Sequence, residues 1–154
     1  MARPTKLTTT SDLSTYLSTT HPHWTSTNLI KLSGGTVNLI CRGTLADKDA
    51  KSPHTTVIIK HAETLSGPGW SFPASRADDE QLVLATLHTS FAPVADPAFG
   101  AVVRTPELLE YLDDSYTLMM EDASEAVDMK SFLVNGLIGE EVASGLGGAL
   151  GVSV

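Results

Sequence analysis

The chain has 154 residues, of which 42% are hydrophobic and 18% are charged. This length is typical of a single domain, and this hydrophobic content is too high for a generally disordered protein. Eighteen acidic and ten basic residues give a net charge of −8, which argues against a general nucleic-acid binder, because phosphate backbones are bound by clustered Lys and Arg. The single cysteine, Cys41, cannot form an internal disulfide, which indicates a reducing compartment.

The sequence contains no recognisable secretory signal or membrane span. Its N-terminal residues are rich in Thr and Ser and contain no apolar h-region. An organellar transit peptide is a weaker alternative, because Asp12 interrupts the acid-poor stretch early. The longest uncharged apolar run, 142–154, is shorter than the roughly 20 residues that a membrane span requires. We therefore expect a cytoplasmic protein that binds neither nucleic acid nor a membrane.

Hydrophobic periodicity and turn residues predict short helices, five strands and one long helix. In chain order, the predicted elements are a helix over 10–19, strands over 28–32, 36–44 and 55–60, a helix from 75 to about 87, strands over 106–112 and 115–121, and short helices over 128–134 and 139–154. Residues 45–54 and 62–73 are expected to be loops, and Asp113-Asp114 indicates a hairpin turn. This order predicts an α+β fold with an antiparallel sheet and one long helix after the third strand.

The two better-defined helices have recognisable start signals. Thr10 or Ser11 can cap the first helix, and Ser75 with Asp78 has the spacing of a capping box at the start of the long helix. The buried face of the long helix is expected to comprise Leu82, Val83, Leu84 and Leu87.

Three further residues invite a chemical interpretation. His21 and His23 could bind a metal, but without a third ligand we expect them to be exposed. Cys41 lies on a predicted strand without a paired histidine motif, so we expect a small buried side chain and not a nucleophile.

A glycine-containing turn between two strands is the first candidate for ligand binding. The run Ser33-Gly34-Gly35-Thr36-Val37-Asn38 allows the backbone to approach a phosphate closely and offers N–H groups that can bind it. An ordinary hairpin turn explains the same residues. The spacing is neither G-x-G-x-x-G nor that of a P-loop.

Lys60 and Glu80 form the second candidate. Lys60 ends the apolar run Val57-Ile58-Ile59, so a rigid strand can present its ammonium group to phosphates. Glu80 lies in the first turn of the predicted long helix, where it can pair with Lys60. Two alternatives stay open: Lys60 is a surface residue at a strand end, and Glu80 complements the helix dipole together with Asp78 and Asp79.

The third candidate is the predicted strand that ends in Glu121-Asp122. A buried strand that continues into an extended segment can offer backbone C=O and N–H groups to the edge of an adenine ring. A core strand with a polar exit explains the same residues.

In this order and spacing, the motifs resemble the family of aminoglycoside phosphotransferases, choline kinases and methylthioribose kinases. The similar stretches are 32–40 (LSGGTVNLI), 56–63 (TVIIKHAE), 76–80 (RADDE), 105–109 (TPELL) and 118–122 (LMMED), and 128–133 is similar to the linker helix that follows in that family. The second stretch has the character of the V-A-I-K strand that supplies the nucleotide lysine of kinases.

The resemblance implies a kinase-like N-lobe on the nucleotide side at 27–123, a helical extension at 1–26, and a linker with a truncated start of the C-terminal lobe at 124–154. It implies ATP as the cofactor. Lys60 would contact the α- and β-phosphates, and Glu80 would orient Lys60. The remaining implied nucleotide contacts are Ser33, Gly34, Gly35, Thr36 and Asn38 over the phosphates, Met120 behind the adenine with Glu121 and Ala123 at its edge, and Ile40 and Ile58 as apolar walls.

The residues that would carry out phosphoryl transfer are missing from the sequence. The family's C-terminal lobe carries an H-G-D-x-x-x-x-N loop and a later aspartate that binds the metal, whereas this sequence has no His-Gly-Asp and no aspartate after Asp128. We therefore expect the chain alone to be inactive as a kinase, with Mg²⁺ bound only if a C-terminal lobe is supplied. The uncharged end, 146–154, suggests that a missing lobe or a separate chain packs there.

The preferred interpretation is thus the ATP-binding lobe of a small-molecule phosphotransferase, whose complete form would transfer a phosphoryl group to a hydroxyl of a small metabolite or antibiotic-like substrate. A non-catalytic binding or regulatory module with a kinase-like N-lobe is the alternative. A third possibility is an α+β domain without a ligand.

Overall fold

A computed structural model of the chain describes residues 7–32, 38–46, 54–90, 94–96, 101–103 and 105–123. The elements are α1 (Thr10–Thr20), the 3-10 turn η1 (Pro22–Trp24), β1 (Ser26–Lys31), β2 (Asn38–Leu45), β3 (Thr56–Ala62), β4 (Leu65–Gly67), β5 (Trp70–Phe72), α2 (Arg76–Ser90), β6 (Val94–Asp96), β7 (Ala101–Val103), β8 (Leu108–Leu112) and β9 (Thr117–Glu121). They belong to two compact units, one formed by 1–86 with 106–122 and the other by 87–105 with 123–154.

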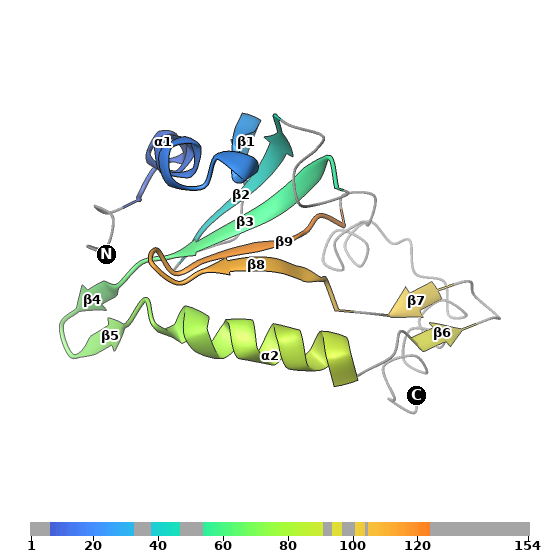
Figure 1. Ribbon diagram of the computed structural model, residues 1–154. Coiled ribbons are helices and arrows are strands. Elements are labelled where there is room, and N and C mark those ends of the chain that lie inside the picture. Colours follow the sequence, from blue (N-terminus) through green and yellow to red (C-terminus); the bar gives the residue numbers. More distant parts are fainter. Residues whose placement is uncertain are drawn as a thin grey trace, which may run out of the picture. The chain divides into compact units, whose positions relative to one another are not determined.

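The first unit contains a five-stranded antiparallel sheet with the strand order β1-β2-β3-β9-β8 (Figure 1). The predicted α+β fold, with one long helix between the third and fourth strands of this sheet, is confirmed. In the second unit, β6 and β7 pair antiparallel. The predicted helices over 128–134 and 139–154 lie outside the described residues.

Two hairpins were not predicted. β4 pairs with β5 in the stretch 62–73, which was expected to be a loop, and β6 pairs with β7 in the Pro-containing connection after α2. These strands have only three residues each, too few for alternation to be visible in the sequence. At the β4–β5 turn Gly69 has φ 78°, a left-handed conformation that glycine adopts without steric cost.

One face of the central sheet forms the main core with α1 and η1. Alternate residues of β2 and β3 are buried, as expected for a strand with one covered face. The fully enclosed members of this core are Leu13, Leu17, Trp24, Cys41, Val57, Ile59 and Met119. Cys41 is the small buried side chain that the sequence predicted, and burial raises the pKa of its thiol.

The cap of α1 differs from the expected one. Thr9, and neither Thr10 nor Ser11, is the N-cap: its side chain accepts a hydrogen bond from the Asp12 N–H at 3.1 Å. The Asp12 carboxylate in return accepts the Thr9 N–H at 3.0 Å, which completes a capping box. Hydrogen bonds from the side chain and the backbone of Thr9 to this carboxylate lower the pKa of Asp12. Three consecutive threonines precede Ser11, so the sequence alone does not determine which of them is the cap.

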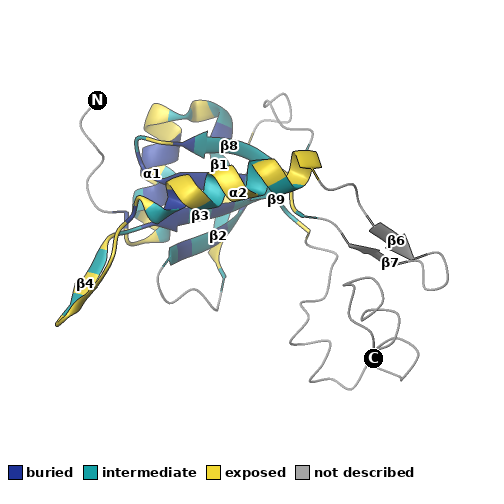
Figure 2. Ribbon diagram, turned by 90° about the horizontal axis from the view of Figure 1, so that it is seen from below, coloured by how far each residue is buried: buried dark blue, intermediate teal, exposed yellow. Residues whose placement is uncertain are grey.

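α2 lies on the opposite side of the sheet from α1 (Figure 1). Its packing differs from the expected one, because Leu82 and Val83 are 63% and 54% exposed. Ala77 is buried and Leu84 packs against the same cluster, seven residues or about two helical turns later. At 100° per residue, Leu82 and Val83 fall outside that stripe. Figure 2 shows the exposed outer side of the helix.

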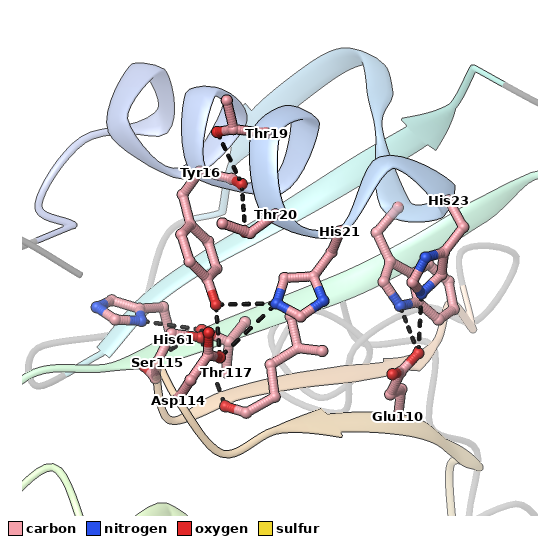
Figure 3. A network of polar contacts seen from close by, with 12 residues as sticks. Tyr16, Thr19, Thr20, His21, His23, His61, Glu110, Asp114, Ser115 and Thr117 are labelled. Carbon is pink, nitrogen blue, oxygen red and sulfur yellow. Dashed lines mark hydrogen bonds and ion pairs between the residues drawn. The ribbon is translucent and has the colours of Figure 1, made fainter. Parts of the chain in front are cut away.

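Polar contacts supplement the apolar packing of α1 and η1 on the sheet (Figure 3). The Tyr16 hydroxyl donates to Asp114 Oδ1 at 2.6 Å and lies 3.0 Å from His21 Nε2. Glu110 accepts the Trp24 indole N–H at 2.8 Å and lies 3.1 Å from His23 Nε2. The expectation that both histidines are exposed is therefore wrong: each is partly buried beside a carboxylate that the sequence places about 90 residues away.

A second group of hydrogen bonds surrounds the His61 side chain. His61 is buried between the Thr117 hydroxyl at 3.0 Å and Glu63 Oε1 at 2.9 Å, and Ser115 donates to Thr117 at 3.0 Å. Glu63 also accepts the Leu7 N–H at 3.0 Å. These bonds satisfy buried polar groups at the edge of the core, where unpaired groups would be costly.

Leucines on the two helices test this assignment of buried and exposed faces. Leu17→Ala should lower the free energy of unfolding by about 2–4 kcal/mol, because it opens a cavity in the core. The matched change Leu82→Ala should alter it by less than about 0.5 kcal/mol. Urea denaturation monitored by circular dichroism measures both, and equal losses would show that the face assignment is wrong.

The environment of Tyr16 should give a pH dependence. Desolvation and the hydrogen bond to Asp114 raise the pKa of Tyr16 from 10.0 to about 12. The folded state therefore favours protonated Tyr16. This stabilisation is fully present below pH 10.0, the pKa of the unfolded state, and it is lost as the pH rises through the folded-state pKa of about 12. We expect wild type to lose roughly 1–2 kcal/mol more than Tyr16→Phe between about pH 10 and pH 12. Urea unfolding at several alkaline pH values measures this difference; parallel curves for the two proteins would contradict it.

Candidate functional site

The sheet face opposite α1 carries several of the predicted site residues. Cross-strand pairing places Ile40, Lys60 and Leu118 in one row, and Arg42, Ile58 and Met120 in the next. Directly opposed residues of antiparallel strands project from the same face of the sheet. These side chains alternate with the buried ones under α1, and all except Leu118 are partly exposed. We refer to this surface as the open face.

Lys60 and Glu80 meet on the open face. The Lys60 ammonium donates to Glu80 Oε1, with side-chain exposures of 19% and 32%. The predicted pairing of these residues is confirmed, although Glu80 is the fifth residue of α2 and so lies just beyond the first turn. A partly exposed ion pair adds little to stability. Its clearest effect is to hold a long, flexible lysine in one direction.

Arg76, the first residue of α2, forms a second link between this helix and the sheet. Its Nη2 donates to the side-chain oxygen of Asn38, the predicted phosphate-loop residue at the start of β2. Its Nη1 donates to the carbonyls of Pro73 at 2.7 Å and Glu63 at 3.0 Å. Sequence reasoning assigned no role to Arg76. The available signal was its position four residues before Glu80, which puts both on one side of a helix.

A third link joins α2 to the edge strand of the sheet. The Tyr111 hydroxyl on β8 donates to Asp78 Oδ1 at 2.5 Å. Asp78 was expected to cap the helix or to complement its dipole. The start of α2 is therefore bonded to three strands, to β2 through Arg76, to β8 through Asp78 and to β3 through Glu80.

The apolar part of the predicted site is also present on the open face. Ile58 and Met120 are opposed in the register of β3 and β9 and are partly buried. Met120 and Tyr111 both pack against the buried cluster that contains Leu118. Ile40 lies one row away, beside Lys60. The structure thus brings an apolar surface and a cationic group together.

The end of β9 agrees with the prediction only in part. The Glu121 N–H donates to the Glu107 carbonyl at 2.9 Å, and the Glu121 side chain lies 3.3 Å from the Glu107 N–H. Since the Glu121 N–H serves this contact, it cannot also meet a ligand in this arrangement. Ala123 is exposed just after the strand.

Sequence reasoning missed an ion pair beside this strand end. Arg42 Nε lies 2.9 Å from Asp122 Oδ2, and the Asp122 side chain is only 1% exposed. Neither Asp122 oxygen has a well-directed hydrogen bond among the described residues, so the contact is mainly Coulombic. Arg42 lies on β2 and Asp122 directly follows β9, which β3 separates from β2, so no local sequence pattern indicated the pair.

Four predicted phosphate-loop residues, Ser33, Gly34, Gly35 and Thr36, lie outside the described residues. Within the described ranges, no three His, Cys, Asp or Glu side chains are grouped so that they could hold a metal ion. None of the described helices combines the length and apolar character that crossing a membrane would require.

Comparison with known proteins leaves the family open. A scan against protein-family models gives no match to this chain, and a search of curated proteins gives none either.

Proposed function

We propose that this chain is the ATP-binding lobe of a kinase-like small-molecule phosphotransferase. The observation that carries the proposal is the Lys60–Glu80 ion pair on the open face of the sheet. The two residues belong to separate sequence motifs, and they are in contact although twenty positions separate them.

The topology around the pair supports the proposal. The three consecutive antiparallel strands β1, β2 and β3 are followed, after the short β4–β5 hairpin, by α2, and β8 and β9 complete the sheet in the order β1-β2-β3-β9-β8. A kinase-like N-lobe needs its nucleotide lysine on the third strand and the partner glutamate on the following helix. Lys60 and Glu80 occupy these two positions.

The chemistry of the open face fits a nucleotide with a polyphosphate chain. Lys60 offers a compact positive charge, and its bond to Glu80 keeps the lysine side chain extended. This arrangement suits binding of the α- and β-phosphates. Ile40, Ile58 and Met120 offer apolar contact for a purine ring.

The proposed role of this chain is to bind the nucleotide without transferring its phosphoryl group. Transfer needs metal ligands and an oriented acceptor hydroxyl, and the sequence lacks both His-Gly-Asp and any aspartate after Asp128.

Nucleotide binding is tested by ATP-dependent thermal stabilisation. At ten times its Kd, ATP should stabilise the chain by about 1.4 kcal/mol, a rise of a few degrees in Tm. Lys60→Ala should weaken binding by about 10- to 100-fold, because a charge-assisted contact with phosphate is lost. Lys31→Ala, which removes an exposed lysine of β1, is the matched control and should behave like wild type.

Two outcomes would count against this proposal. No stabilisation of wild type at millimolar ATP would favour an α+β domain without a nucleotide site. Equal losses in Lys60→Ala and Lys31→Ala would indicate non-specific attraction of the anion.

The absence of transfer is tested separately. The purified chain, incubated with ATP, Mg²⁺ and a panel of hydroxyl compounds that includes an aminoglycoside, choline and methylthioribose, should form no phosphorylated acceptor above background. Mass spectrometry of the acceptors measures this directly. Phosphorylation that disappears in Lys60→Ala would overturn the proposal that the chain only binds the nucleotide.

A further inference from the structure

We infer that Arg76 is a positioning residue for the nucleotide site: it holds Asn38 and the start of α2 in place, and through α2 it holds Glu80 against Lys60. This inference rests on the proposed function, because it assigns Arg76 a part in the same site.

The contacts of Arg76 join three segments of the chain. Its guanidinium donates to Asn38 on β2, to the Glu63 carbonyl just after β3, and to the Pro73 carbonyl just before α2. A planar guanidinium carries five N–H donors in a fixed arrangement, so it can make such contacts at the same time. A lysine at this position would have the charge but not the geometry.

The spacing along α2 connects Arg76 to the ion pair. Arg76 and Glu80 are four residues apart and lie on one side of the helix. Their partners, Asn38 and Lys60, lie on adjacent strands, and the register pairs Ile40 with Lys60, so Asn38 is two residues from the position opposite Lys60. The same helical face therefore meets β2 and β3 at neighbouring points.

Few side chains of α2 are buried, so polar contacts contribute strongly to its position. Of its fifteen residues, all of them described, only Ala77 is buried, while Leu82 and Val83 are largely exposed. Little apolar packing would therefore keep the helix in register if its polar contacts were lost. Without Arg76, the start of α2 can shift and the Glu80 carboxylate can leave Lys60.

Arg76 acts through its neighbours and not by touching a phosphate. Its guanidinium nitrogens bond to backbone carbonyls and to Asn38 in the structure. A residue in this position alters nucleotide affinity by fixing the direction of other groups. Asn38 is then part of the same unit, and removing either partner should have the same consequence.

The first experiment measures the Kd of the full chain for ATP by calorimetry. The variants are Arg76→Ala, Asn38→Ala, the double variant and Arg76→Lys, with Lys31→Ala as the control for net charge. Each Ala variant should weaken binding by about tenfold, and the double variant by no more than the stronger single one. Arg76→Lys should also weaken binding although it keeps the charge. Wild-type affinity in Arg76→Ala, or additive losses in the double variant, would overturn the inference.

The second experiment needs no nucleotide. Acylation of Lys60 by an amine-reactive ester, followed by peptide mass mapping, reports how firmly Glu80 holds the ammonium. Arg76→Ala should increase the labelling rate of Lys60 by about as much as Glu80→Gln does. Asp79→Asn, an exposed change in the same helical turn, should leave it unchanged. Unaltered labelling in a folded Arg76→Ala would overturn the inference.

The two experiments separate the two proposals. If wild type binds no ATP, the proposed function fails, and Lys60 labelling still decides whether Arg76 positions the pair. If Arg76→Ala does not fold, as judged by circular dichroism, Asn38→Ala and Arg76→Lys are used in both assays with the same expected directions.

Discussion

The burial of one sheet face under α1 and η1 is the constraint on which the rest of this structure depends. Side chains of a strand alternate between two faces, so enclosing Cys41 and Ile59 together with Trp24 fixes the direction of their neighbours. A shift of register by one residue would put Lys60 into the core, at a high cost for an unpaired charge. The apolar packing on one side thus determines which groups are available on the other.

The two helices of this unit are attached by different forces. α1 contributes the fully buried Leu13 and Leu17, so hydrophobic burial dominates its packing, and the Tyr16 hydroxyl adds a hydrogen bond to Asp114. α2 buries one alanine and relies on polar links from Arg76, Asp78 and Glu80. Polar links depend on direction, so they specify where a helix lies more than they stabilise it. This division suits the proposed role of α2, which is to position the Glu80 carboxylate.

Local patterns predicted the central sheet, the long helix and the Lys60–Glu80 pair, because each depends on alternation or on a short motif followed along the chain. They failed where the outcome depends on tertiary contacts. Leucine content suggested that Leu82 is buried, but the helix turns it away from the sheet. Nothing in the local sequence around Arg76 indicates its bond to Asn38, and the carboxylates beside His21 and His23 lie about 90 residues later in the sequence.

The short hairpin between β3 and α2 has a further consequence, because it carries one of the two tryptophans of the chain. Trp70 is 50% exposed and its indole covers Gly67, where an added Cβ would lie 2.5 Å from the ring. Trp24, by contrast, is 1% exposed within the core. The intrinsic fluorescence therefore has two separable sources. Trp24 should give a blue-shifted emission that iodide does not quench, and it reports on the core under α1. Trp70 should give a red-shifted emission that iodide quenches, and it reports on the segment before α2. With Trp70→Phe, the remaining emission would report on the core alone.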